Sequence, residues 1–133
     1  MSPVFLDTSA AYALLVASDL NHLRAAAAFR RFQAQAAVLA TTSYVLVETY
    51  ALLASRVGLE AVKAFRDDFR PLLDVTWVGQ DLHDRGVHLL VARPDASLSV
   101  VDSVSFVMMR DRNLGEAFAY DRHFGDEGFT VID

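Results

Sequence analysis

The chain has 133 residues, of which 53% are apolar and 22% are charged, and it contains no cysteine. This length supports one domain with a substantial core, and this composition excludes a disordered chain. Because no apolar run reaches the roughly 18 residues of a membrane-spanning helix, and no basic segment leads into an apolar one at the start, we expect neither a membrane protein nor a secreted one. The absence of cysteine excludes disulfides, thiolate zinc sites and a cysteine nucleophile, and a cytoplasmic protein fits these features.

The formal net charge is −5, with eleven arginines and one lysine. Taken at face value, an acidic chain argues against a nucleic-acid partner. That objection does not hold if several acids bind cations, because without four such acids the chain carries only −1. Net charge therefore leaves the class of partner open.

Short apolar runs alternate with helical patterns through the whole chain. In chain order we predict a strand at 4–6, helices at 10–16 and 23–35, a strand at 38–41, helices at 44–56 and 60–69, a strand at 75–78, helices at 81–91 and 99–110, and strands at 117–120 and 129–132. Asn21 and Ser43 are the expected N-caps of the second and third helices, and Pro71 ends the fourth. Strands that are apolar throughout are buried on both faces, as in a parallel sheet covered by helices. We therefore predict a single α/β domain over residues 1–133, with three layers (α/β/α) and a central, mostly parallel five-stranded sheet.

The first predicted strand leads directly into an acid and two hydroxyls, in the segment Phe5-Leu6-Asp7-Thr8-Ser9. Ligands of open α/β sheets bind beyond the carboxyl ends of the strands, which makes Asp7 a candidate for chemistry. An aspartate is also a good helix N-cap, so capping alone explains Asp7 equally well. Ser9 is an equally good cap, and it would leave the Asp7 carboxylate free.

Glu48 lies in a predicted helix that carries no other charge before Arg56. The neighbours three and four positions away are apolar or aromatic, namely Tyr44, Val45, Ala51 and Leu52. A carboxylate in such surroundings costs several kcal/mol unless it is paired or binds a metal. The alternative is an acid at the rim of a buried helix.

Two further acids lie at the ends of predicted elements. Asp102 follows Ser99 by three residues, which matches a capping box, although an acid in a first helical turn is also rigid enough to serve a site. Asp121 directly follows the fourth strand, as Asp7 follows the first, with a turn aspartate as the alternative. In a parallel sheet Asp7 and Asp121 meet at the same edge.

Four acids gathered at one edge indicate a metal site, because two like charges about 4 Å apart repel by roughly 4 kcal/mol at an effective dielectric near 20. Oxygen donors without a His or Cys ligand spacing favour Mg²⁺ or Mn²⁺ over zinc. Sites of this kind typically hydrolyse phosphodiesters, with the ion activating water and stabilising the transition state. His123, near Asp121, is a minor candidate for a phosphate contact, whereas His83 and His88 are assigned to the surface or to packing.

Four motifs occur in order along nearly the whole chain, at 5–9, 41–48, 99–106 and 117–124. They read FLDTS, TTSYVLVE, SVVDSVSF and AFAYDRHF, and with this spacing the sequence resembles the PIN-domain family and, within it, the VapC-like ribonuclease toxins. The resemblance implies that Asp7, Glu48, Asp102 and Asp121 are catalytic and bind Mg²⁺ or Mn²⁺. It further implies that Ser9 orients this cluster or contacts its water. Ala119 departs from the pattern, since many relatives carry a Thr or Ser hydroxyl there.

From these residues and this resemblance we expect a metal-dependent endoribonuclease that hydrolyses RNA and acts as the toxin of a type II toxin–antitoxin pair. The resemblance also implies a homodimer and a small antitoxin protein bound across the active site. The main alternative is a non-catalytic PIN-like module that binds protein or RNA. A phosphatase with an aspartyl nucleophile fits less well, because position 9 is Ser rather than a second Asp and the only lysine, Lys63, lies in an amphipathic helix.

Overall fold

The structure is a computed structural model that describes residues 3–133. Its strands form one sheet in the order β3-β2-β1-β4-β5, and every neighbouring pair is parallel. The strands are β1 (Val4–Leu6), β2 (Leu39–Thr42), β3 (Leu73–Thr76), β4 (Glu116–Phe118) and β5 (Thr130–Ile132). The predicted α/β class and five-stranded sheet are confirmed, with a sheet that is parallel throughout.

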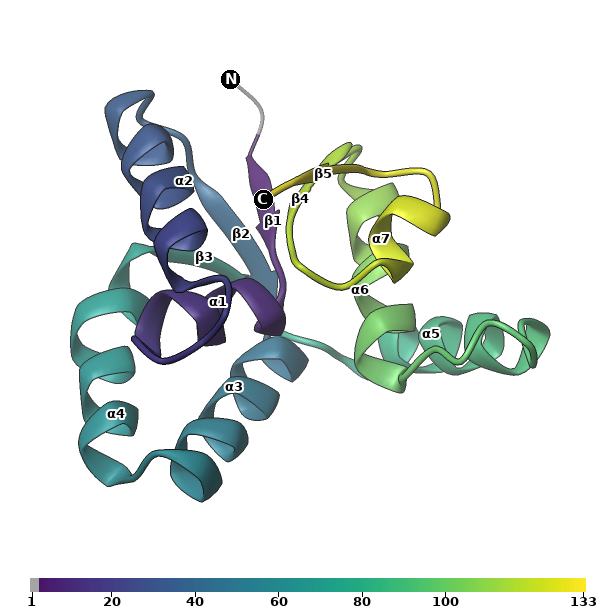
Figure 1. Ribbon diagram of the computed structural model, residues 1–133. Coiled ribbons are helices and arrows are strands. Elements are labelled where there is room, and N and C mark those ends of the chain that lie inside the picture. Colours follow the sequence, from purple (N-terminus) through teal and green to yellow (C-terminus); the bar gives the residue numbers. More distant parts are fainter. Residues whose placement is uncertain (1–2) are drawn as a thin grey trace.

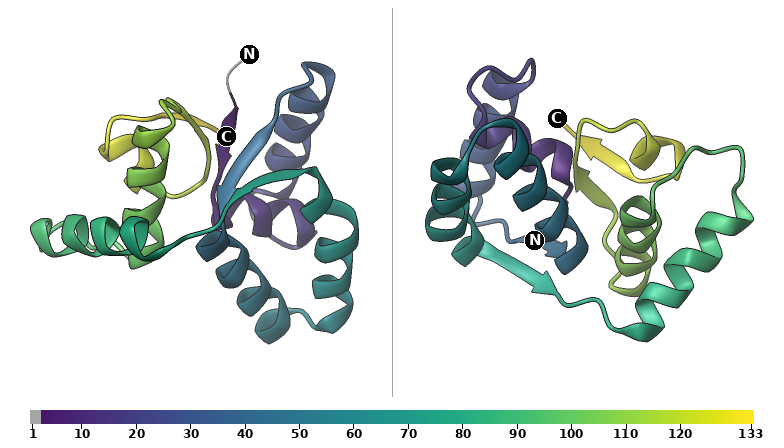
Figure 2. Two further views of the ribbon diagram at one scale, coloured as in Figure 1. Left: turned by 180° about the vertical axis from the view of Figure 1, so that it is seen from behind. Right: turned by 90° about the horizontal axis from the view of Figure 1, so that it is seen from below.

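Helices connect the strands and cover both faces of the sheet (Figure 1). In chain order they are α1 (Thr8–Leu15), α2 (His22–Ala34), α3 (Ser43–Arg56), α4 (Leu59–Ala64), the π-helical turn η1 (Phe65–Phe69), the 3₁₀ turn η2 (Arg70–Leu72), α5 (Gln80–Ala92), α6 (Val100–Asp111) and α7 (His123–Asp126). Helices α1 to α4 lie on one side of β1, and α5 to α7 on the other. Helix α5 packs along α6 and projects away from the sheet (Figure 2).

The core has two halves, one on each face of the sheet. Val4 and Leu6 point into the half that contains Phe32 and Phe118, whose rings are 5.2 Å apart. Phe5, between them, points to the opposite half with the helices α6 and α7. Successive side chains of a strand face opposite sides, so a strand covered on both faces is apolar at every position. This is why the strands appear as continuous apolar runs in the sequence.

Some boundaries differ from the predicted ones. β3 begins at Leu73 and ends before Trp77, whose side chain is 69% exposed, so the high β-propensity of 75–78 placed this strand too late. The predicted helix 60–69 is an α-helix only to Ala64 and continues as η1. α7 was not predicted, because a four-residue helix shows no periodicity. No helix within residues 3–133 is long and apolar enough to cross a membrane.

Two caps also differ. Thr42, not Ser43, caps α3, and its hydroxyl accepts a hydrogen bond from the backbone N–H of Val45 at 3.2 Å. The Ser43 hydroxyl instead accepts from the backbone N–H of Val78 at 2.9 Å, which ties α3 to the chain after β3. Asn21 occupies the N-cap position of α2, although its side chain makes no capping hydrogen bond.

The strand order reverses direction between β1 and β4. From β1 the chain moves to β2 and β3 on one side, whereas β4 and β5 lie on the other. In open α/β sheets the crevice outside the carboxyl ends of the strands at such a switch point is the usual ligand site. The backbone N–H of Asp7 donates to the carbonyl of Phe118 at 3.1 Å, which places the ends of β1 and β4 side by side.

Candidate active site

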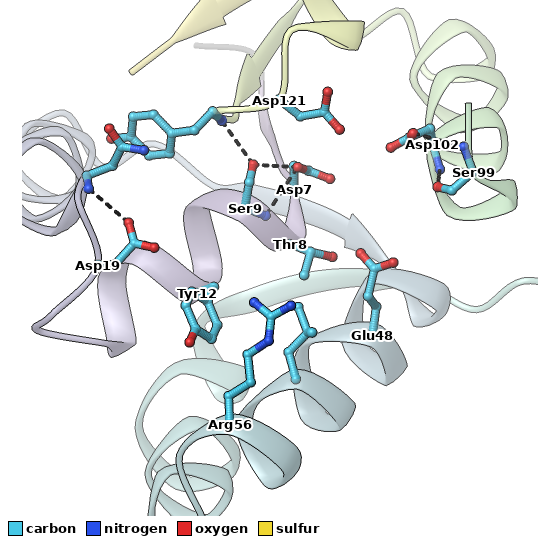
Figure 3. Close-up of a pocket in the computed structure, with 13 residues that line it drawn as sticks. Asp7, Thr8, Ser9, Tyr12, Asp19, Glu48, Arg56, Ser99, Asp102 and Asp121 are labelled. Atoms are coloured by element: carbon cyan, nitrogen blue, oxygen red, sulfur yellow. Dashed lines mark hydrogen bonds between the residues drawn. The ribbon is translucent and has the colours of Figure 1, made fainter. Parts of the chain in front are cut away.

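A cavity of about 550 Å³ opens at this switch point, and acids from four segments line it (Figure 3). Asp7 follows β1, Glu48 is on α3, Asp102 is in the first turn of α6 and Asp121 follows β4. The structure thus brings all four predicted acids, together with Ser9, into one cavity.

Asp7 is the most deeply buried of these acids, with 4% of its surface exposed. Its Oδ2 atom accepts hydrogen bonds from the Ser9 hydroxyl at 2.6 Å and from the Ser9 backbone N–H at 3.2 Å. Asp7 is therefore the N-cap of α1, as one of the two alternatives has it, and Ser9 does not fill this role. Burial raises the pKa of Asp7 to about 7, Ser9 opposes this rise, and the charges of Asp102 and Asp121 add to it.

Asp102 combines a structural role with a place in the cavity. Its Oδ2 atom accepts from the backbone N–H of Ser99 at 3.1 Å, and the Ser99 hydroxyl accepts from the Asp102 N–H at 3.0 Å. This is the predicted capping box. Burial raises the pKa of Asp102, and the Asp121 charge raises it further, against the hydrogen bonds from Ser99.

His123 completes a tight group with Asp102 and Asp121. Its Nδ1 atom lies 2.8 Å from Asp121 Oδ1 and 3.5 Å from Asp102 Oδ2, but neither ring nitrogen has a well-directed hydrogen bond to the described residues. One ligand atom from each of the three side chains lies within 4.8 Å of the others. The sequence suggested only a phosphate contact for His123, because α7, which places it beside the acids, was not predicted.

Asp7 and Glu48 lie outside this tight group, although they line the same cavity as Asp102 and Asp121. Glu48 is half-buried, and its carboxylate extends from α3 toward the other acids (Figure 3). The alternative, in which Glu48 is an acid at the rim of a buried helix, therefore accounts for its burial but not for the direction of its carboxylate.

The donor set fits a divalent cation. Within residues 3–133, no lysine or arginine forms an ion pair with Asp7, Glu48, Asp102 or Asp121. His123 is the single cationic partner that the described chain offers to this cluster, and it is charged only when protonated. The carboxylate oxygens are suitable ligands for Mg²⁺ or Mn²⁺, and His123 adds a nitrogen donor that Mg²⁺ does not favour. An ion there would offset both the repulsion between the acids and the free-energy cost of burying the Asp7 carboxylate.

The cavity has further lining residues that sequence reasoning did not single out as site residues. They are Thr8, Tyr12, Asp19, Asn21, Leu52, Arg56, Ser99 and Tyr120. The Thr8 hydroxyl is buried and has no hydrogen-bond partner in the described part of the chain. Ala119 is fully buried in the half of the core that contains α6 and α7, and as an alanine it supplies no hydroxyl.

A parallel sheet with an acid-lined cavity at its switch point defines an α/β domain built around an oxygen-rich site. The chain belongs to the PIN-domain family, whose model matches residues 4–128. It is similar to the 23S rRNA-specific endonuclease VapC20 of Mycobacterium tuberculosis, in the strains CDC 1551 / Oshkosh and ATCC 25618 / H37Rv, with 33% identity over 130 residues and 97% of each chain covered. The crystal structure of M. tuberculosis VapC20, described as a Sarcin-Ricin loop cleaving toxin, matches with a TM-score of 0.83 at 33% identity and covers 96% of each chain. The predicted resemblance to PIN-domain VapC toxins is thereby confirmed.

Proposed function

We propose that this chain is an endoribonuclease that hydrolyses RNA phosphodiester bonds with Mg²⁺ or Mn²⁺, and that it is the toxin of a type II toxin–antitoxin pair. The observation that carries the proposal is the convergence of Asp7, Glu48, Asp102 and Asp121 on one cavity without a lysine or arginine partner among the described residues. The similarity to an rRNA endonuclease over nearly the whole chain supports the same reaction.

In this proposal the four acids, with His123, hold the ion, which when bound supplies the Lewis acidity that polarises a phosphoryl oxygen and activates water. The protein's own contribution is preorganisation. Ser9 fixes Oδ2 of Asp7, and Ser99 fixes Oδ2 of Asp102, so neither carboxylate has to reorient when substrate arrives. Without a cation, the same carboxylates repel an RNA phosphate, and activity therefore requires the metal.

The similar proteins suggest the first substrate to test. VapC20 is described as specific for 23S rRNA and as cleaving the sarcin–ricin loop. We propose a structured RNA of this kind as substrate, with residues 1–133 acting as one domain in the cytoplasm. Homodimers and a small antitoxin protein are the partners that the resemblance leads us to propose.

The experiment is cleavage of a synthetic hairpin with the sarcin–ricin sequence, in Mn²⁺, in EDTA and with the Asp7→Asn variant. We expect a defined cut in Mn²⁺ and none in EDTA or with Asp7→Asn. Activity that survives both EDTA and the substitution would overturn the mechanism. Calorimetry in which the folded protein binds no divalent ion would favour a non-catalytic module instead.

A further inference from the structure

One cationic side chain lines the acidic cavity. Of the described residues that form its wall, Arg56 alone is a lysine, arginine or histidine. It lies in the last turn of α3, and its guanidinium extends beside Tyr12 toward the acids (Figure 3). A basic residue near a helix C-terminus also stabilises the helix by a few tenths of a kcal/mol. That effect explains a charge at this position but not its direction into the cavity.

The guanidinium of Arg56 is free to bind an anion. It forms no ion pair and no side-chain hydrogen bond with residues 3–133, although six of the eleven arginines are paired with acids. Its Cζ atom instead lies 5.7 Å from the centre of the Tyr12 ring. A guanidinium stacked on an aromatic face is held in place while its N–H groups stay available. Arg56 is thus a positioned donor that lacks an acceptor within the described chain.

The spacing along α3 relates Arg56 to the proposed catalytic acids. Glu48, Leu52 and Arg56 are four residues apart and form one stripe of the helix, and all three line the cavity. Eight residues of α-helix span about 12 Å. A nucleic-acid strand carries one charge per roughly 3.4 Å of helix axis, so about 12 Å corresponds to about three nucleotides. The guanidinium extends back along this distance but forms no ion pair with any of the four acids, so we take its phosphate to be one that flanks the phosphate at the acids.

We propose that Arg56 binds a backbone phosphate of the RNA within three nucleotides of the cleaved bond, and that Tyr12 holds the guanidinium for this contact. The inference rests on the proposed ribonuclease function and adds the path of the substrate, which runs from the acids along the stripe of α3. Arg56 is in this proposal a binding residue for a flanking phosphate. It supplies affinity rather than chemistry.

The first test measures steady-state cleavage of the sarcin–ricin hairpin in Mn²⁺ by wild type, Arg56→Gln, Arg56→Lys and Arg30→Ala. Arg30 is a matched control, since it is an exposed arginine that does not line the cavity. Loss of a charge-assisted hydrogen bond predicts a rise in KM of about 10- to 100-fold for Arg56→Gln, with kcat within about threefold. Arg56→Lys should recover part of the loss, and Arg30→Ala should leave KM within about twofold. The slope of log KM against log salt should fall by about 0.7 to 0.9 for Arg56→Gln.

The outcomes of this test distinguish failure of the Arg56 inference from failure of the proposed ribonuclease function. If wild type cleaves and Arg56→Gln keeps the wild-type KM and salt slope, the Arg56 inference is overturned while the ribonuclease stands. The inference is likewise overturned if Arg30→Ala raises KM as much as Arg56→Gln does. If wild type cleaves no RNA in Mn²⁺, the function fails and the inference fails with it. Arg56 is exposed, so thermal melts of the variants should match wild type and exclude unfolding as the cause.

A second test identifies the phosphate. Hairpins with one neutral methylphosphonate linkage at a time are cleaved by wild type and by Arg56→Gln. We expect one linkage, within three nucleotides of the cut, whose neutralisation raises KM for wild type but not for Arg56→Gln, because the contact is then already lost. If neutralising every linkage affects both proteins equally, Arg56 does not contact the RNA backbone.

Discussion

The hydroxyl of Ser9 donates a 2.6 Å hydrogen bond to the carboxylate of Asp7, and the same Ser9 oxygen accepts one from the backbone N–H of Tyr120 at 2.9 Å. Ser9 therefore connects the first acid of the site to the chain that leaves β4, just before Asp121. This side chain adds a link between the segments that carry Asp7 and Asp121, beside the parallel pairing of β1 with β4. Its role is positional, and its loss should affect both stability and catalysis.

We expect Ser9→Ala to lower the free energy of unfolding by about 1–3 kcal/mol, because the Tyr120 N–H loses its acceptor and the buried Asp7 loses a donor. RNA cleavage should fall by about tenfold or more as the carboxylate loses its fixed orientation. Urea denaturation and single-turnover cleavage measure the two effects. Ser55→Ala is a matched control, since the Ser55 hydroxyl is exposed and bonds only the carbonyl of Leu52. Wild-type cleavage by Ser9→Ala would contradict this role.

The burial of Asp7 predicts a pH dependence of stability in the metal-free protein. The folded state keeps the proton of Asp7 up to about pH 7, whereas the unfolded chain releases it near pH 3.8. Between these values the folded state binds more protons, so the free energy of unfolding falls as pH rises. The raised pKa of Asp102 acts in the same direction.

The full effect of Asp7 amounts to roughly 4 kcal/mol, at about 1.4 kcal/mol per pKa unit. Asp7→Asn keeps an N-cap and removes the charge, so in EDTA it should be more stable than wild type at pH 8 and show a weaker dependence between pH 4 and pH 7. Urea unfolding across this range provides the measurement. A wild-type stability that rises with pH through this window would refute the burial argument.

The group formed by His123 with Asp102 and Asp121 predicts a contribution to metal affinity. We expect His123→Ala to weaken Mn²⁺ binding by about 10- to 100-fold, as the loss of a ligand or of a residue that orients ligands does. Isothermal calorimetry at pH 8 measures the affinity. His88→Ala, which removes an exposed histidine on α5, should leave it unchanged. Equal affinities for His123→Ala and wild type would place His123 outside the metal site.

Much of the fold could be predicted because local pattern and burial agree. The apolar strand β1 and the apolar residues of β2 and β4 are covered on both faces, and the capping box at Ser99 and Asp102 is visible as a four-residue motif. β3 was misplaced because the exposed Trp77 has high β-propensity without a strand partner. Whether a residue belongs to β3 depends on its pairing with β2, and a local sequence pattern does not reveal that pairing.

Part of the site could also be predicted from local sequence patterns. Asp7 and Asp121 follow apolar strands, and Glu48 interrupts an apolar helix, so each acid has a local signal. Arg56 and Tyr12 are 44 residues apart in the sequence and meet only through the packing of α1 against α3. No spacing rule connects them, and the long-range contact is what gives the arginine its direction.

The packing of α5 on α6 predicts the effect of one glycine substitution. A Cβ atom at Gly86 would lie 2.4 Å from Val104 Cγ2 and 3.1 Å from its Cα. We expect Gly86→Ala to lower the free energy of unfolding by about 1–3 kcal/mol through overpacking. Gly115→Ala is the matched control, because nothing lies within 4 Å of that Cβ position. Denaturation curves compare the two, and equal stabilities would show that α5 shifts without cost.

The most direct test of the central claim is cleavage of the sarcin–ricin hairpin as a function of Mn²⁺ concentration by wild type, Asp121→Asn and Asp19→Asn. Asp19 lines the same cavity but lies outside the group of Asp102, Asp121 and His123. We predict cleavage that requires Mn²⁺, a loss of about 100-fold or more for Asp121→Asn, and rates within a few-fold of wild type for Asp19→Asn. Cleavage independent of Mn²⁺, or an Asp121→Asn variant as active as Asp19→Asn, would contradict the proposed metal site.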